Sequence, residues 1–289
     1  MNFSRMSGMA LLLVLLCSGP FGSVIGAEKL ESGQKAEKAW PQWDGKETTA
    51  VYAQRAGLKA AETVDLGGGV TLELVLVPAG EFQMGRDTGT APEEKPLHKV
   101  KISQPFYLAK YETTQEQYAK LMGSNPSSFN NPKNPVENVS WDDAQEFCKK
   151  LGTLAKRKVQ LPTEAQWEYA CRAGSTKDDE GPVFDEGWHD NSGYPRHPLT
   201  AGEKRANAWG LHDMYGNVGE WCADWYDDKY YASSPGEDPQ GPAQGSYRVL
   251  RGGAWGEHVA QCMPAHREKL HPITRYYYYG FRVMVVASK

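Results

Sequence analysis

The chain contains the run Trp209-Gly-Leu-His-Asp-Met-Tyr-Gly-Asn-Val-Gly-Glu-Trp-Cys-Ala-Asp-Trp225, in which three tryptophans and three glycines lie among acidic and amide side chains. This mixture shows neither the 3.6-residue period of an amphipathic helix nor the alternation of a half-buried strand. We therefore predict that residues 209–225 form a tightly wound, largely buried loop around which the rest of the domain is organised.

Two side chains of this run are candidate ligands for a metal ion. Asn217 and Glu220 lie three residues apart in a glycine-flanked turn, so their oxygens could converge on one hard cation. Calcium is bound by several oxygen ligands in flexible geometry. The alternative is an Asx-type turn in which Glu220 caps a neighbouring amide. Spacing alone leaves both interpretations open.

The overall charge argues against a nucleic-acid partner. The 289 residues carry a formal net charge of −4 and give a pI of about 6.0, and lysine and arginine are spread along the chain. A basic patch of the kind that tracks phosphates is therefore not expected. We expect a monomer that acts on a peptide or a small-molecule substrate.

Residues 1–27 have the pattern of a signal peptide. Arg5 provides a positive start, residues 9–17 are apolar, and Gly26-Ala27 offers a cleavage point. The apolar stretch is short for a transmembrane helix. We expect an exported protein, periplasmic or extracellular, with a lipid anchor on Cys17 as the only route to a membrane.

Four cysteines follow the signal peptide: Cys148, Cys171, Cys222 and Cys262. They contain no Cys-x-x-Cys pair, which argues against a zinc ribbon or a thioredoxin-type site. In an oxidising compartment one or two disulfides are expected, with three possible connectivities.

The remaining pattern predicts α+β structure. Residues 28–69 are polar and are expected to form a linker, so the domain should begin at residue 70. Strands are expected at 71–78, with 82–85 as the returning strand of a hairpin, and at 99–103, 106–109, 246–255 and 276–286. Residues 28–69 and the turn-rich stretches between these strands give a high loop fraction.

Three short helices should begin at hydroxyl N-caps. Each cap has a polar residue three positions later, and each helix should stop at a glycine. The caps are Thr114, Ser140 and Thr163, and the glycines are Gly123, Gly152 and Gly174. We therefore expect antiparallel strands with short helices in one domain over residues 70–289.

Seven motifs appear together in a recognisable order: Val77-Pro-Ala-Gly-Glu-Phe-Gln-Met-Gly, Tyr111-Glu-Thr-Thr-Gln-Glu-Gln-Tyr, Pro135-Val-Glu-Asn-Val-Ser-Trp-Asp-Asp-Ala, Leu161-Pro-Thr-Glu-Ala-Gln-Trp-Glu-Tyr-Ala, Gly216-Asn-Val-Gly-Glu-Trp, Arg251-Gly-Gly-Ala-Trp and Gly280-Phe-Arg-Val. Over about residues 70 to 286 the chain resembles the formylglycine-generating enzyme, or sulfatase-modifying factor, family. The resemblance implies a variant C-type-lectin-like fold. It also implies that Asn217 and Glu220 belong to a structural calcium site.

The resemblance does not extend to the copper site of the family's formylglycine-forming members. Those members hold copper with two cysteines shortly after the Arg-Gly-Gly turn. Here Glu257 stands about where the first would fall, and Cys262 is the only thiol nearby. Because copper(I) prefers paired thiolates, we do not expect copper to bind. Cys262 lies closer to the family's structural cysteine, so we hypothesise a Cys171–Cys262 disulfide, with Cys148 and Cys222 either reduced or paired.

The segment after the glycine turn is the candidate substrate cleft, lined by Trp255, His258 and Arg267. Glu257 could act as a general base, as in the exported family members that finish pyoverdine chromophores and share an acidic residue here. The alternatives are an exposed carboxylate or a salt bridge to Arg267. His258, His266 and His271 lie close in sequence, but their spacing does not fit a facial iron triad, and surface or hydrogen-bonding roles are expected.

Three functions remain open from the sequence. The first is an exported family member that binds a peptide-like or small substrate and, if catalytic, acts as an oxidoreductase without copper. The second is a non-catalytic lectin-like recognition module, favoured by the run of tyrosines at 276–279, of which at least two are expected to be core residues. The third is a true formylglycine-generating, sulfatase-activating oxidase.

Overall fold

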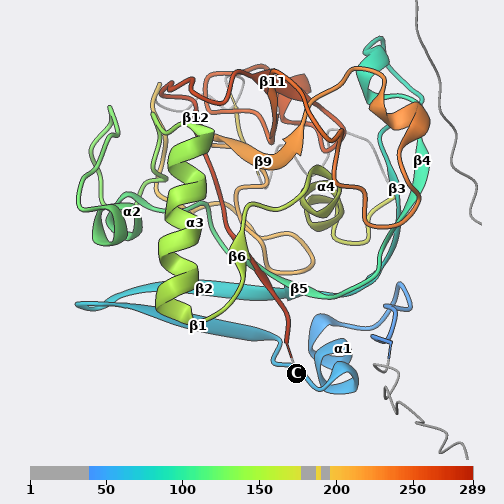
Figure 1. Cartoon of the computed structure of the whole chain (residues 1–289), viewed down its shortest axis with the longest axis horizontal. Helices are drawn as coiled ribbons and strands as arrows, with labels where there is room; N and C mark the ends of the chain where they lie inside the picture. Colours follow the sequence, from blue (N-terminus) through green and yellow to red (C-terminus); the bar gives the residue numbers. More distant parts are fainter. Residues whose placement is uncertain (1–38, 177–186, 190–195, 289) are drawn as a thin grey trace, which may run out of the picture. The chain divides into compact units, whose positions relative to one another are not determined.

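The helices begin where the sequence places their caps. A computed structural model describes residues 39–176, 187–189 and 196–288 (Figure 1). Its α-helices are α1 Thr49–Ala56, α2 Gln115–Met122, α3 Trp141–Ala155 and α4 Glu164–Arg172, and its short 3-10 helices include η1 Pro92–Glu94, η3 Tyr230–Ser233 and η4 Val259–Cys262. Thr114, Ser140 and Thr163 each form a capping box with the residue three positions later, as predicted.

One helix runs past its predicted end. The helix α2 stops at Gly123, whereas α3 continues through Gly152 to Ala155. The chain then turns at Lys156, which has a φ of 53°. The backbone N–H of Lys156 donates a hydrogen bond to the carbonyl oxygen of Gly152. A Cβ at Gly152 would lie 3.0 Å from the carbonyl oxygen of Arg157. This glycine therefore makes room for the returning chain and does not end the helix.

The first sheet has five strands in the order β1-β2-β5-β13-β6, all paired antiparallel. Its strands are β1 Ala61–Gly67, β2 Val70–Val77, β5 Phe106–Ala109, β6 Val159–Gln160 and β13 Met284–Val286. The predicted hairpin is wrong, because β2 already has a partner on each side. The strand β3, Gly80–Met84, pairs instead with β4, His98–Ile102.

The second sheet contains the last seven residues of the tryptophan-rich run. Its order is β11-β10-β9-β12, and its strands are β9 Gly219–Trp225, β10 Arg248–Arg251, β11 Glu268–Leu270 and β12 Tyr279–Gly280. A further parallel pair joins β7 Gly187–Trp188 to β8 Tyr215–Gly216. The run is buried as predicted, but residues 219–225 form a strand rather than a loop, because Trp221 and Glu220 pair with Leu250 and Arg251. The predicted closing strand at 276–286 is broken into β12 and β13.

Residues 39–69 belong to the folded domain and are not a linker. The strand β1 pairs along β2, and Tyr52 of α1 is buried, with its hydroxyl donating to the Pro41 carbonyl at 2.7 Å. The polar composition that suggested a linker suits an edge strand, in which only Leu66 is buried. Residues 28–38 of the expected linker, and the expected signal peptide with Cys17, lie outside the described residues.

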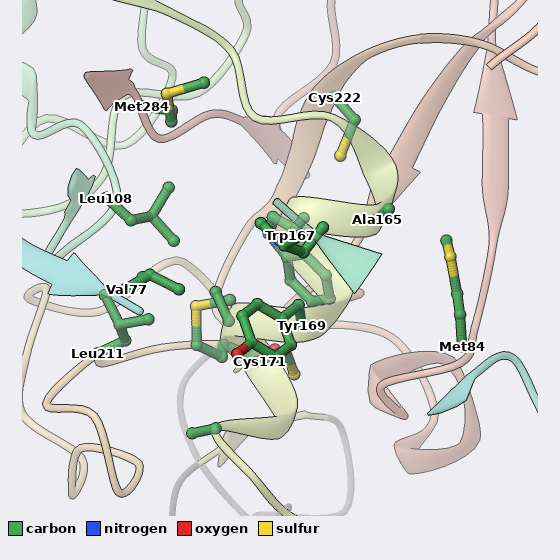
Figure 2. Packing of buried hydrophobic residues seen from close by; sticks show 14 of the residues in the cluster. Val77, Met84, Leu108, Ala165, Trp167, Tyr169, Cys171, Leu211, Cys222 and Met284 are labelled. Carbon is green, nitrogen blue, oxygen red and sulfur yellow. Dashed lines mark hydrogen bonds between the residues drawn. The ribbon is translucent and has the colours of Figure 1, made fainter. Parts of the chain in front are cut away.

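The buried side chains form two clusters. Figure 2 shows Ala165, Trp167, Tyr169 and Cys171 of α4 together with Cys222 of β9, all in one cluster. The second cluster includes Trp221, Phe147 and Phe281. Two of the largest fully buried side chains, Trp167 and Trp221, thus lie in different clusters. Among the described residues, no helix is both long enough and apolar enough to cross a bilayer.

The hypothesised disulfides are not present among the described residues. Cys148, Cys171, Cys222 and Cys262 are all buried thiols. The Cys171 Sγ lies 3.7 Å from the Met214 carbonyl oxygen, and the Cys222 Sγ lies 3.9 Å from the Glu220 carbonyl oxygen. Burial raises the pKa of Cys171 to about 12. The apolar surroundings therefore favour protonated, unreactive thiols.

Thiol counting tests this arrangement. The native protein should react slowly with a thiol reagent, because all four side chains are buried. Unfolding in concentrated guanidinium without a reductant should then release four equivalents of thiol, or five where Cys17 is retained. Two equivalents fewer would show a disulfide such as the hypothesised Cys171–Cys262 pair.

Candidate functional site

The tryptophan-rich run is centred on a buried ion pair. Both carboxylate oxygens of Glu220 accept from Arg282, at 2.7 to 2.9 Å, and one also accepts from the indole N–H of Trp167 at 2.8 Å. Arg282 also donates to the carbonyl oxygens of Ala109 and His212. Both charged side chains are almost completely buried. The guanidinium therefore supplies the positive charge next to Glu220.

Asn217 takes part in a second set of hydrogen bonds. Its Oδ1 accepts from the Leu199 backbone N–H at 2.9 Å, and its Nδ2 donates to Glu112 at 2.7 Å. Burial, followed by the charges of Asp213 and Glu220, raises the pKa of Glu112 well above its usual range. This arrangement is not the local Asx-type turn that was the alternative, because Asn217 and Leu199 are far apart in sequence.

These contacts do not fit calcium ligation by Asn217 and Glu220. The side-chain oxygens of both residues already accept hydrogen bonds, and the Glu220 carboxylate already faces a cation. Across residues 39–176, 187–189 and 196–288, no group of three or more His, Cys, Asp or Glu side chains could hold a metal ion. The calcium site thus stays a prediction from the sequence.

Arg267, expected in the substrate cleft, is a structural residue. Its side chain is fully buried, and its guanidinium donates to both oxygens of Glu164, at 2.7 and 2.9 Å, and to the Glu93 carbonyl oxygen at 2.8 Å. Arg251 lies beside it, paired with Glu168. Because its hydrogen bonds go to Glu164 and the backbone, Arg267 does not form the alternative salt bridge to Glu257.

Five aromatic side chains from three segments of the chain form what we call the aromatic surface: Phe129, Trp255, Tyr276, Tyr277 and Tyr278. The ring centroid of Trp255 lies 4.8 Å from that of Tyr278, 6.1 Å from that of Tyr277 and 6.0 Å from that of Phe129. The rings of Tyr276 and Tyr277 are 4.2 Å apart. Tyr276 is 40% exposed, and the other four are half-buried. The surface is therefore accessible to a ligand.

Local sequence explains how the surface forms. Gly256 has no side chain, and a Cβ there would collide with the hydroxyl of Tyr278, so the glycine lets this ring lie over the backbone beside Trp255. At least two of the four tyrosines were expected in the core, but only Tyr279 is buried. Because β12 is only two residues long, no alternation extends along residues 276–279.

Glu257 lies next to this surface as a half-buried carboxylate. Its Oε2 accepts from the Ala254 backbone N–H at 3.0 Å. Burial, and then the charge of Glu268, raise the pKa of Glu257 to about 7. The carboxylate of Glu268 accepts a hydrogen bond from the hydroxyl of Tyr279 at 2.9 Å. Burial raises the pKa of Glu268 as well. The two glutamates therefore compete to stay ionised.

The histidines have local structural roles. His258 is exposed and caps η4, and its ring nitrogen accepts from the Ala260 backbone N–H at 3.3 Å. His266 lies 3.3 Å from Glu94, and the exposed His271 is near Tyr247. These positions agree with the expected surface and hydrogen-bonding roles.

The structure brings together some predicted residues and adds others. Trp255 is part of the aromatic surface and Glu257 follows it by two residues, whereas Arg267 is buried in the core. Phe129 and Glu268 were not predicted, because Phe129 lies in an Asn/Pro-rich loop remote in sequence and Glu268 has no motif around it. Glu268 also lines a cavity of about 780 Å³ with Tyr226, Arg267 and Lys269.

The fold and site define an α+β domain of the C-type-lectin-like class. The chain belongs to the sulfatase-modifying factor family, because residues 68–287 match the family model described as the sulfatase-modifying factor enzyme 1-like domain. The chain is 30% identical to the formylglycine-generating enzyme of Streptomyces coelicolor, over 65% of this chain and 80% of that protein. It is 34% identical to the serine/threonine-protein kinase pkn1 of Chlamydia pneumoniae over 74% of this chain. That match spans 38% of the kinase's length.

Solved structures show the same fold. Treponema denticola variable protein 1 matches with a TM-score of 0.71 and 28% identity, over 78% of this chain and 99% of that one. PvdO from Pseudomonas aeruginosa matches with a TM-score of 0.69 and 27% identity, over 78% and 98% respectively. The C-type-lectin-like α+β architecture expected from the sequence is thereby confirmed.

Proposed function

We propose that this protein is an exported member of the sulfatase-modifying factor family that binds a peptide-like or small-molecule substrate on the aromatic surface. The observation that carries the proposal is the accessible cluster of five rings around Trp255 with the carboxylate of Glu257 beside it. Aromatic side chains supply large contact areas at binding sites, and the few polar groups beside them give orientation.

The thiols support a function that does not use the copper chemistry of the formylglycine-forming relatives. By the resemblance, Glu257 stands about where the first copper-binding cysteine of those members would fall, and Cys262 is fully buried. Its Sγ would lie only 2.8 Å from a Cβ at Gly253, which shows how closely the glycine turn covers it. A carboxylate and one covered thiol are a poor donor set for copper(I).

Binding to the aromatic surface can be measured with acetylated tripeptide amides of the form Gly-Xaa-Gly, in which Xaa is arginine, citrulline, lysine, tyrosine or glutamate. At least one should bind saturably in a fluorescence or NMR titration. Trp255→Ala should weaken that binding by about 30-fold, because central aromatic residues contribute about 2 kcal/mol or more to such sites. Tyr247→Ala is the control, since Tyr247 is another exposed aromatic outside the surface.

The peptide titrations show whether a ligand binds and whether it binds on the aromatic surface. Equal binding by the wild type and by Trp255→Ala would place the ligand elsewhere. Saturable binding by none of the five peptides would contradict the proposed function. Copper-dependent conversion of a Cys-x-Pro-x-Arg peptide to the aldehyde would favour the formylglycine-generating alternative.

A second candidate function, oxidation of the bound substrate, is favoured by the acid–base properties of Glu257. A carboxylate with a pKa of about 7 is suited to accept a proton near neutral pH. Glu257 would take one proton from the substrate and pass it on to the reduced oxygen. The substrate's second hydrogen and the two electrons would also pass to dissolved oxygen, so that the substrate loses two hydrogen atoms, oxygen becomes hydrogen peroxide and Glu257 returns to its ionised form. Oxygen uptake by the wild type that is lost in Glu257→Gln would support this function, whereas binding without oxygen uptake would indicate a recognition module.

A further inference from the structure

We infer that the ligand group recognised by the aromatic surface and Glu257 is an organic cation, an ammonium or a guanidinium. This inference rests on the proposed binding function and names the chemical class of its ligand. Two features of the site lead to it: the number of ring faces gathered at one accessible place, and the carboxylates beside them.

The rings provide the first part of a cation site. Aromatic faces carry partial negative charge and attract a cation within about 6 Å of the ring centroid. Trp255 lies edge to face with Tyr278, at 81°, and with Phe129, at 85°. The rings of the aromatic surface are therefore oriented differently from one another. A guanidinium could stack on one ring while its N–H groups reach a neighbouring carboxylate.

The carboxylates provide the second part. Glu257 and Glu268 interact electrostatically, and neither forms an ion pair with a described residue. Both arginines close to this site in sequence pair with other carboxylates, and Lys269, which follows Glu268, pairs with Asp228. Arg275 pairs with Asp143 at 2.7 Å, and Arg267 pairs with Glu164. Among the described residues, neither glutamate of the acidic pair is therefore neutralised by an ion pair with arginine or lysine.

The same charges disfavour other ligand classes. A phosphate or carboxylate ligand would be repelled by the two glutamates, and it would gain nothing from the ring faces. A neutral ligand such as a sugar could stack on the rings, but its affinity would not depend on the charge of Glu257. Charge dependence of binding is therefore the property that distinguishes a cation from a neutral ligand.

Binding of a cation should be linked to proton release. A bound positive charge favours the ionised form of Glu257, so the pKa of this carboxyl falls on binding. The groups that face it or act on its neighbour are Glu268, Tyr278, Tyr279 and His266. Since the tyrosines stay protonated near neutral pH, affinity should rise as the pH passes upward through about 7.

The test compares arginine with citrulline, a neutral side chain of nearly the same shape. Acetyl-Gly-Arg-Gly-amide should bind the wild type about tenfold more tightly than the citrulline peptide. The preference should grow between about pH 6 and about pH 8. Agmatine is the second arm: binding as tight as that of the arginine peptide would indicate a small amine, and weaker binding a peptide side chain.

Two glutamate variants locate the effect. Glu257→Gln should reduce the arginine preference to about twofold or less, and it should fold normally because an amide oxygen can also accept from Ala254. Glu237→Gln is the matched control, since Glu237 is an exposed glutamate paired with Lys101 and remote from the rings in sequence. Its arginine preference should equal that of the wild type.

The result also separates this inference from the proposed function. If the citrulline peptide binds as tightly as the arginine peptide, or if Glu257→Gln keeps the full preference, the ligand is not recognised as a cation although the surface still binds. If no peptide of the panel binds, the proposed binding function itself fails.

Discussion

Replacing Arg282 with methionine should lower the free energy of unfolding by about 3 to 5 kcal/mol, the usual cost of removing one partner of a buried ion pair. The substitution would leave Glu220 buried without its cation. Glu112 and Asp213 act electrostatically on the same arginine, and Arg282 lowers the pKa of both. Three buried carboxyl groups would therefore lose their common positive charge.

Urea unfolding near neutral pH measures this loss. Glu220→Gln should also destabilise the protein, and the double variant should cost less than the sum of the two, with a coupling of about 1 kcal/mol or more. Arg55→Met is the control, because Arg55 is exposed where it pairs with Glu47, and its removal should cost much less than that of Arg282. A small effect of Arg282→Met would indicate that another cation, such as the expected calcium, compensates Glu220.

The sequence predicted well those structural features that depend only on interactions between residues close together in the chain. Thr114, Ser140 and Thr163 cap helices because a hydroxyl and a polar side chain three positions later satisfy neighbouring backbone groups. That interaction needs no information from the rest of the chain. The motifs similarly identified the family, and with it the fold class.

Features that depend on remote partners could not be predicted in this way. The strand β3 pairs with β4 because β1 and β5 occupy the edges of β2, which no local pattern reveals. The polar strand β1 has the composition of a linker and is ordered only by its pairing with β2.

The same limit applies to the candidate site. Trp255 and Glu257 are adjacent in sequence, so their proximity was evident, whereas Phe129 reaches them from a loop more than a hundred residues earlier. Arg267 follows the glycine turn closely, but its charge is compensated by Glu164 of α4, and it faces the core. Separation along the chain therefore predicted neither that Phe129 contacts Trp255 nor that Arg267 is buried away from the site.

A second large effect is expected from Asp224, whose carboxyl group should make stability fall as the pH rises. Burial, and then the charge of Glu164, raise the pKa of Asp224 from 3.8 to about 8. Between pH 3.8 and about pH 8, Asp224 is therefore protonated in the folded state and ionised in the unfolded state. For a carboxyl group with a raised pKa, the contribution to stability is full below the unfolded pKa and is lost as the pH rises through the folded one.

Asp224→Asn isolates this contribution. Asparagine can keep the hydrogen bond from the Glu164 backbone N–H, which Asp224 accepts at 2.8 Å, but it has no proton to lose. From about pH 5 to about pH 8, the unfolding free energy of the wild type should fall by about 3 kcal/mol more than that of the variant. Urea unfolding across this range measures the difference.

The control for this titration is an exposed carboxylate with the opposite shift. Asp228 pairs with Lys269 on the surface, and that hydrogen bond lowers its pKa, so Asp228→Asn should leave the slope between about pH 5 and about pH 8 unchanged. Parallel stability curves for the wild type and Asp224→Asn would mean that Asp224 is ionised in the folded protein. The charge of Arg267, which lowers the pKa of Asp224, would then outweigh the effects of burial and of Glu164.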